Sequence, residues 1–279
     1  MVPFSLSSTD VSDIDTISEF LAHSEIPSLH NWGSVDVIVL CGNAILQIAE
    51  HVFSALTAQP LLAKTLVICG GIGHSTRLLY EAFGQSRKYS DLAHELDGLP
   101  EAIAYELMLQ RYYPELAESI KHGTLKLIIE DKSENCGANA IQTRRVLELH
   151  AISTMKSCVI VQDPTMSLRT LAAFQHTYKD VSPSPEFFAC PTFVPKAYLD
   201  EASQMHILAK HAGPGIDFEP AALWKNQRFF DLLMGEIPRL RDDENGYGPN
   251  GKNFIVHVTI PEEVEAAWTR LHKVLDFKR

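Results

Sequence analysis

The chain has 279 residues, of which 46% are hydrophobic and 21% are charged, so it can bury a sizeable core and is not a disordered chain. Its net charge of −11 argues against non-specific binding to nucleic acid or to an anionic membrane surface, although a local basic pocket stays compatible with it. The five cysteines form no CxxC pair, and an odd number of unpatterned thiols fits a reduced, intracellular compartment.

The amino-terminal segment MVPFSLSSTDVSDID has no basic region and no long apolar stretch, so it is not a typical secretory signal. No window of the sequence approaches the ~20 apolar residues that a membrane span needs. We therefore expect a soluble, cytoplasmic protein with no membrane partner. Ser8, Thr9 and Asp10 are favoured N-cap types, and the apolar residues at helical spacing behind them predict a first helix over 11–21.

Short apolar runs rich in β-branched residues recur along the next part of the chain. Such runs are typical of strands that are buried on both faces, and these strands belong to parallel sheets. Helical patterns lie between the runs, so the sequence predicts an α/β fold with a doubly wound, Rossmann-like, mostly parallel sheet. The predicted strands are 35–40, 65–69, 125–129 and 157–161, with 186–190 as a candidate for one more.

The alternation of strands and helices ends near Pro195. We expect a Rossmann-like domain with the N-terminal helix at 1–195 and a smaller C-terminal α+β domain at 196–279. The elements expected in the second domain are helices near 197–211 and 219–235, a Gly-rich polar loop, a strand at 254–258 and a last helix from Pro261.

Polar residues follow each of the four predicted strands. The carboxyl ends of parallel strands meet at one edge of the sheet, where open α/β sheets bind their ligands. Helix capping explains any one of these turns taken alone, whereas the four together favour a ligand site. The turns are CGNA at 41–44, GGIGHSTR at 70–77, EDKSENCGAN at 130–139 and QDPTMSLR at 162–169.

The glycine turn GGIGHST loosely matches a dinucleotide fingerprint. It follows the second strand, however, and the acidic end of the next strand, Glu130-Asp131, lies far beyond the ~20 residues that the fingerprint requires, so ordinary NAD binding is rejected. The turn is neither a P-loop nor a GxSxG nucleophile elbow. Its glycines permit close backbone approach, and the helix start behind it offers free N–H groups to an anion. We expect a ligand-binding turn that consists of Gly70, Gly71, Gly73, His74, Ser75 and Thr76.

Several charged residues accompany these turns. Arg77 and Arg169 fall in predicted first helical turns, where a positive charge opposes the helix dipole, and bidentate binding of a carboxylate or phosphate would explain both. Glu130 and Asp163 end buried strands and suit contact with ligand hydroxyls, an amine or a metal-bound water. Glu101 stands at a helix start, where a favourable dipole is a sufficient explanation.

No HExxH or similar spacing supports a metal site, and none is predicted; His206 and His211 are five positions apart and incidental. Cys41 and Cys136 lie near predicted helix starts, a position that favours the reactive thiolate, although a buried inert cysteine is the commoner case.

The segment GEIPRLRDDENGYGPNGKNF carries Arg239 and Arg241 among glycines. Two interpretations stay open for it. It is either a charged surface loop or a lid over 236–253 that brings these arginines over the sheet edge, near the glycine turn.

Five segments in order resemble the YdcF-like proteins, which belong to a broad family of unknown function with SanA-like and ElyC-like envelope-associated members. The segments are VIVLCGNA, VICGGIGHST, IEDKSENCGANA, VIVQDPTM and GEIPRLRDDENGYGP, and the resemblance runs from about Ser34 to Trp268. Envelope members carry an N-terminal membrane anchor that this sequence does not match, so it resembles the soluble branch.

The resemblance implies a Rossmann-like core with a smaller C-terminal domain, and it points to S-adenosylmethionine as a ligand. Ala138 stands where the family often has Glu before the motif asparagine, which puts catalysis in doubt while binding can persist. The ExGxGxG motif of methyltransferases is missing, so methyl transfer does not follow. The motif residues that the resemblance implies are Gly70, Gly71, Glu101, Glu130, Ser133, Asn135, Asn139, Asp163 and Arg169.

Three hypotheses on function remain open. The first is a protein, with or without turnover, that binds a nucleotide-like or S-adenosylmethionine-like small molecule. The second is a hydrolase or transferase that acts on a phosphorylated or glycan-like substrate, with Glu130 or Asp163 as base and Arg169 as anion clamp. The third is a non-catalytic module whose polar edge recognises a protein partner.

Overall fold

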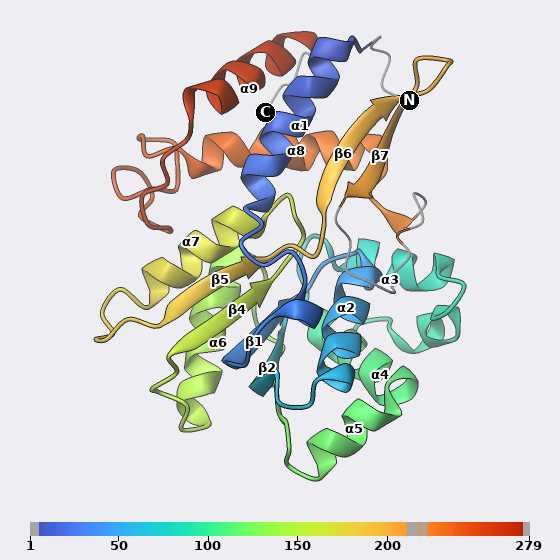
Figure 1. Ribbon diagram of the computed structural model, residues 1–279, viewed down its shortest axis with the longest axis vertical. Coiled ribbons are helices and arrows are strands. Elements are labelled where there is room, and N and C mark those ends of the chain that lie inside the picture. The colour runs from blue at the N-terminus through green and yellow to red at the C-terminus, as the bar shows by residue number, and fades with distance from the viewer. Residues whose placement is uncertain (1–5, 211–217, 219–221, 276–279) are drawn as a thin grey trace.

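The computed structural model describes residues 6–210, 218 and 222–275. Its centre is a parallel five-stranded sheet with the order β3-β2-β1-β4-β5 (Figure 1). The predicted strands, the candidate fifth strand and the doubly wound α/β class are therefore confirmed. The strands are β1 (Val35–Cys41), β2 (Ala63–Cys69), β3 (Lys126–Glu130), β4 (Ser157–Val161) and β5 (Glu186–Cys190).

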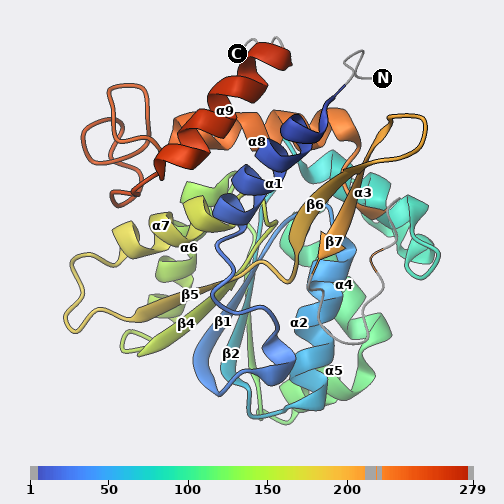
Figure 2. The same cartoon turned by 45° about the horizontal axis from the view of Figure 1, so that its top comes forward.

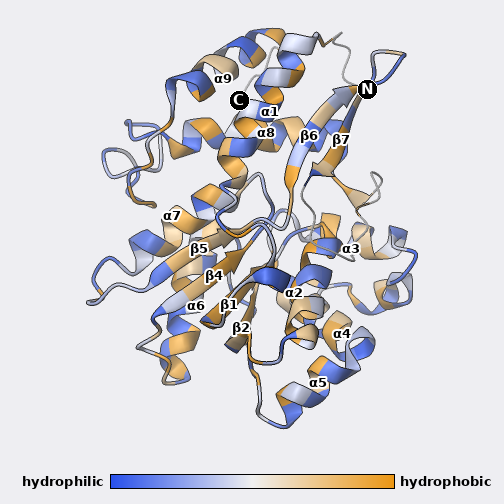
Figure 3. Ribbon diagram, in the orientation of Figure 1, coloured by the Kyte–Doolittle hydropathy of each residue, from blue (hydrophilic) through white to orange (hydrophobic). Residues whose placement is uncertain are grey.

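Helices cover both faces of this sheet, which is why its central strands are apolar on both sides (Figure 3). Helix α2 connects β1 to β2, and helices α4 and α5 lie in the connection from β2 to β3, so these three cover one face of the sheet. Helices α6 and α7 pack together on the other face. Helix α3 leads into the short 3₁₀ helix at Ser90–Glu95. The bounds are α2 (Leu46–Ala58), α3 (Thr76–Gln85), α4 (Glu101–Tyr112), α5 (Pro114–Lys121), α6 (Cys136–Leu149) and α7 (Ser167–Thr177).

The strand order reverses between β1 and β4. The chain leaves β1 toward β2 and β3, then crosses back to pair β4 on the other side of β1. The connections on either side of this point run over opposite faces, so a crevice opens there beyond the carboxyl ends of the strands.

The C-terminal part differs from the prediction in its first element. An antiparallel hairpin of β6 (Val194–Leu199) and β7 (Met205–Lys210) occupies most of the range where a helix was predicted near 197–211. The carboxylate of Asp200 accepts hydrogen bonds from the amides of Ala202 and Gln204 and closes the turn. In β7, side chains alternate between buried and more exposed positions, a period of two that the prediction missed.

Two further expectations for this part meet different outcomes. Helix α8 (Asn226–Leu240) begins later than the helix predicted near 219–235, a range that lies partly outside the described residues. The run at 254–258 is not a strand, and it is held by backbone hydrogen bonds from Phe254 and Ile255 to the carbonyl of Tyr247 and from Val256 to that of Ala172. Helix α9 (Glu262–Val274) confirms the last helix.

The first helix, α1 (Ser8–Ala22), is confirmed, and a capping box between Ser7 and Asp10 begins it. It lies beside α9, α8 and β6 at one end of the molecule (Figures 1 and 2). The guanidinium of Arg270 in α9 binds the buried carboxylate of Asp13 through two hydrogen bonds of 2.6 and 2.8 Å. The predicted boundary near Pro195 stays a prediction. No helix in the described part of the chain is long and apolar enough to cross a bilayer.

Candidate functional site

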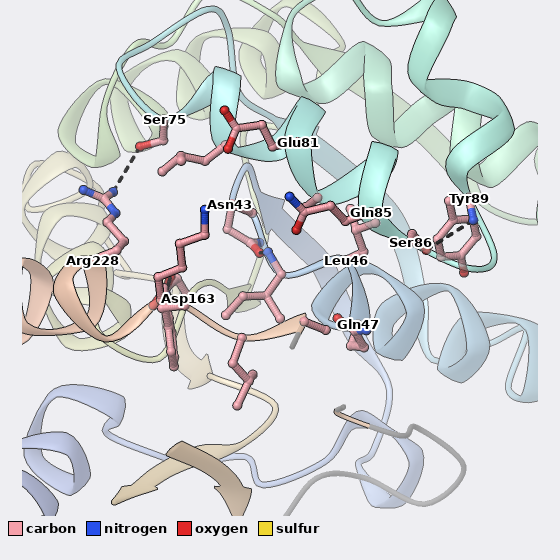
Figure 4. Close-up of a pocket in the computed structure, with 18 of the residues that line it drawn as sticks. Asn43, Leu46, Gln47, Ser75, Glu81, Gln85, Ser86, Tyr89, Asp163 and Arg228 are labelled. Atoms are coloured by element: carbon pink, nitrogen blue, oxygen red, sulfur yellow. Dashed lines mark hydrogen bonds between the residues drawn. The ribbon is translucent and has the colours of Figure 1, made fainter. Parts of the chain in front are cut away.

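A cleft of about 580 Å³ opens where the strand order reverses, at the carboxyl ends of β1 and β4 (Figure 4). Its walls are the loop after β1, helix α3, the loop after β4 and the first turns of α8. Small-molecule sites commonly enclose about 300–1,000 Å³, so the cleft has the size of one. The lining residues that matter below are Gly42, Gln47, Ser75, Asp163, Trp224 and Arg228.

A second, smaller pocket of about 70 Å³ adjoins this cleft, and Gly42, Ser75 and Met166 line both. It is formed by the glycine turn, the first residue of α4 and the turn that begins α6. We call it the inner pocket. The predicted site residues that line it are Gly70, Gly71, Gly73, His74, Ser75, Glu101, Ser133, Asn135 and Asn139.

The remaining predicted residues do not line the inner pocket. Asp163 lines the larger cleft, as does Ser75, which lines both cavities. Thr76, Glu130, Arg169, Arg239 and Arg241 line neither cavity. The structure therefore brings most of the candidates together at the sheet edge, and their role in binding a ligand stays a prediction. The residues that line neither cavity have structural partners that are described next.

The glycine turn packs directly on the turn before α6. The Gly71 amide donates to the carbonyl of Ser133 over 2.6 Å, and a Cβ at Gly71 would lie 2.7 Å from that same oxygen. Gly70 has φ +152°, in the region that favours glycine. The turn thus needs its glycines for contact between two loops, whatever it binds.

Glu130 is occupied by its own turn. Its carboxylate accepts hydrogen bonds from the amides of Lys132 and Ser133, over 2.7 and 2.9 Å, and from the hydroxyl of Ser133. The side chain is 1% exposed. Because its oxygens already hold these donors, Glu130 stabilises the loop before α6 and is poorly placed to act as a base.

Arg169 is not free to clamp an anion. Its guanidinium forms a two-point ion pair with the buried carboxylate of Glu236 in α8. Burial disfavours the charged form, but Glu236 outweighs this effect and the pKa of Arg169 is raised. The expected role of Arg169 at the site is therefore replaced by a structural one, joining α7 to α8.

The expected lid does not form. Arg239 binds Glu236 over 2.9 Å at the end of α8. Arg241 binds Glu265 over 2.7 and 2.9 Å and lies 4.5 Å from the ring centre of Trp268. Since neither arginine lines the cleft or the inner pocket, the prediction that they approach the glycine turn is wrong.

The cleft is instead lined by other cations, namely Arg87, Lys88, Lys225 and Arg228. Arg228, in the first turn of α8, is the one that lies beside the glycine turn. Its Nη2 lies 3.4 Å from the hydroxyl oxygen of Ser75, across the boundary between the cleft and the inner pocket (Figure 4). Sequence reasoning missed Arg228 because no local motif marks it. Its position depends on how α8 packs over the sheet edge, which is a long-range property.

Asp163 contributes a buried carboxylate to the cleft. One oxygen accepts hydrogen bonds from the amide and hydroxyl of Thr165, and the other accepts from the indole N–H of Trp224 over 2.8 Å. Burial raises the pKa of Asp163, and these hydrogen bonds oppose the rise. Trp224 was also missed, again because a contact distant in sequence places it.

Glu101 lies at the first position of α4 and faces the inner pocket. Its Oε1 accepts a hydrogen bond of 2.9 Å from the hydroxyl of Thr76, whose oxygen also accepts from the amide of Gly73. Burial raises the pKa of Glu101. Thr76 thus orients the carboxyl from behind the pocket, which explains why it is near the site without lining it.

The cysteine and histidine candidates have simpler surroundings. Cys41 and Cys69 are buried on neighbouring strands with their sulfurs 3.6 Å apart, and Cys136, also buried, contacts the sulfur of Met166. His206 pairs with Asp200 in the hairpin. His211 lies outside the described residues. Within the described ranges, no group of three or more His, Cys, Asp or Glu side chains could hold a metal ion.

No family model matches the sequence.

Proposed function

We propose that the protein binds a nucleotide-like or S-adenosylmethionine-like small molecule in the cleft between the ends of β1 and β4. The observation that carries this proposal is the position of the cleft. A cavity of about 580 Å³ at the point where the strand order reverses, with Arg228 and the buried carboxylate of Asp163 in its wall, matches the usual ligand site of an open α/β sheet.

The two ends of the cleft suit different parts of such a ligand. Arg228 and Ser75 lie at one end, whereas Gln47, Gln85 and Tyr89 lie at the other (Figure 4). Arg228 forms no ion pair with a carboxylate among the described residues, so its charge is available to the acidic end of a ligand.

The opposite end offers hydrogen-bonding groups for a base or another polar ring. The buried Oε1 of Gln47 has no hydrogen-bond partner within the described part of the chain, and a small rotation of the amide would let it accept from a ligand amino group. Leu46, Leu78 and Leu223 supply apolar surface between the two ends.

Calorimetry and thermal unfolding with adenosine, AMP, ATP and S-adenosylmethionine test this proposal. A bound ligand at a hundredfold excess over Kd adds about 2.7 kcal/mol to the free energy of unfolding. Arg228→Ala should weaken AMP, ATP and S-adenosylmethionine at least tenfold and leave adenosine, which has no acidic end, unchanged. Arg145→Ala, an exposed arginine of α6, is the matched control. If none of the four ligands at millimolar concentration shifts the melting temperature, the proposal is refuted.

A further inference from the structure

We propose that the inner pocket is a phosphoester-cleaving subsite in which Glu101 is the general base. The inference rests on the proposed nucleotide-like ligand. It identifies the substrate class as a phosphate ester whose phosphoryl group enters the inner pocket while the rest of the molecule occupies the cleft.

The unpaired oxygen of Glu101 is the first observation. The side chain is only 8% exposed, and its Oε1 accepts from Thr76, but its Oε2 accepts no hydrogen bond from any described residue. This oxygen keeps some exposure to solvent at the wall of the inner pocket, so a water molecule or a ligand can donate to it there.

The backbone around Glu101 leaves room for this oxygen. A Cβ at Gly42 would lie 2.0 Å from Oε2, and Gly42 lines both cavities. Oε2 therefore lies in the wall of the inner pocket, close to the glycine that both cavities share. A reacting group that passes from one cavity to the other would meet this oxygen.

Helix capping does not account for this carboxyl. The amides of Glu101 and Ala102 already donate to the carbonyls of Gly71 and Gly70, over 3.2 and 2.8 Å, so the start of α4 is tied to the end of β2. These bonds also hold the side chain in place. Glu101 is thus both fixed in position and free to bind at one oxygen.

The inner pocket is rich in groups that donate to an anion. The Asn139 side chain, 6% exposed, makes no hydrogen bond to a described residue and lines the pocket. The first turn of α6 and the start of α3, at Ser75, also face it. In the first turn of α6 the amide of Ala138 already donates to Asn135, whereas the amides of Cys136 and Gly137 donate to no described residue. Arg228 stands at the entrance.

The volume fits this role. About 70 Å³ is several times the ~10–15 Å³ that one water molecule needs by the same measure, so a phosphoryl group can enter the inner pocket. The larger groups of a phosphate ester would remain in the cleft.

The reaction that this arrangement supports is hydrolysis. The oxygen of a water molecule attacks phosphorus and forms the new P–O bond, and its proton passes to Oε2 of Glu101. The ester P–O bond breaks, and its electron pair goes to the leaving oxygen, which then takes the proton from Glu101. The products are inorganic phosphate and the free alcohol, so atoms and charge balance with water as the only co-reactant.

The rate should depend on the ionisation of Glu101. Burial raises its pKa, so the rate should increase with pH through a value above that of an ordinary glutamate. Thr76 contacts this carboxyl, and Tyr80 and Tyr105 lie close enough to sense its charge. The other titratable or charged groups at the pocket are His74, Glu134, Cys136 and, at its entrance, Arg228.

The test measures inorganic phosphate released from the esters AMP and p-nitrophenyl phosphate between pH 4 and pH 9, together with nucleotide binding by calorimetry. Glu101→Gln keeps the shape of the side chain and should lower kcat about 10²–10⁴-fold, the usual contribution of a general base, while KM and nucleotide Kd change little. Glu106→Gln is the control, because Glu106 is a half-buried carboxyl on the same helix that lines neither cavity.

A second variant is needed in case Glu101→Gln does not fold. Glu101→Asp withdraws the carboxyl by one methylene and should also lower kcat, but the increase of the rate with pH should remain. Phosphate release that survives Glu101→Gln, or wild-type protein that binds nucleotides but releases no phosphate, overturns this inference and leaves the proposed function standing. If no nucleotide binds to the wild-type protein, both proposals fall.

Discussion

The guanidinium of Arg169 and the carboxylate of Glu236 form a buried two-point ion pair that joins α7 to α8. Arg239 binds the same carboxylate from the end of α8. This pairing sets the position of α8 over the sheet edge. It therefore also sets the position of Arg228, at the other end of the same helix.

Removing Glu236 should be strongly destabilising. Glu236→Ala leaves the Arg169 charge buried without its partner, which costs about 3–5 kcal/mol in such cases. Glu265→Ala is the comparison, because its pair with Arg241 is partly exposed and should cost only about 1 kcal/mol or less. Urea unfolding of the two variants measures the difference. Equal small losses would show that the buried pair does not hold α8 in place.

Stability should fall in mildly acidic solution because of His51. This side chain is fully buried, its Nε2 accepts from the amide of Leu29, and burial lowers its pKa from 6.5 to about 4. Between these two values the unfolded chain binds a proton that the folded protein does not, so the free energy of unfolding decreases as pH falls from 6.5 to about 4.

The loss in the free energy of unfolding follows from the size of the pKa shift of His51, and it approaches about 3 kcal/mol when the pH falls to about 4. Urea unfolding at pH 7 and pH 4.5 measures it. His51→Gln should flatten the pH dependence, whereas the exposed His94→Gln should leave it unchanged. A pH slope that persists in His51→Gln would assign the effect to other groups.

Gly42 should tolerate no side chain. In Gly42→Ala the new methyl group would displace Glu101, and overpacking of this kind costs about 1–3 kcal/mol. Phosphate release and ligand binding should fall together. Gly33→Ala meets no atom within 4 Å and should lose neither stability nor binding. Full binding and turnover in Gly42→Ala would contradict the placement of Glu101 between the cavities.

Ligand binding should be visible in tryptophan fluorescence. Among Trp32, Trp224 and Trp268, only Trp224 lines the described cleft, and its indole N–H binds Asp163. We expect AMP or S-adenosylmethionine to change the emission of the wild-type protein and not that of Trp224→Phe. Trp32→Phe should keep the response. A response that survives Trp224→Phe would place the ligand elsewhere.

The parts of the fold that the sequence predicts are those set by local pattern. The apolar runs of β1 to β5 identify buried strands, and the polar turns after them converge because parallel strands end at one edge. The β6–β7 hairpin was missed because its signal is the side chain of Asp200 binding two amides in a turn, a feature weaker than the apolar residues around it.

The charges of the site were harder to predict, for a different reason. Arg169 and Arg228 are both arginines near a helix start, and what distinguishes them is whether a carboxylate elsewhere in the chain binds the guanidinium. Glu236 neutralises the first from a position 67 residues away, whereas no described carboxylate pairs with the second. Long-range pairing of this kind leaves no trace in the spacing of either residue.

The position of α1 has a consequence for the order in which the protein is completed during synthesis. Helix α1 leaves the ribosome before the other described helices, yet part of its surface packs on α9 and is bound there by Arg270. While translation continues the five strands can pair, and α7, β6 and α8 can cover part of α1, but the surface that packs on α9 has no partner until α9 has emerged. The nascent chain therefore carries a partly uncovered helix through most of the synthesis of the described residues, and the contact between α1 and α9 forms only after translation of α9.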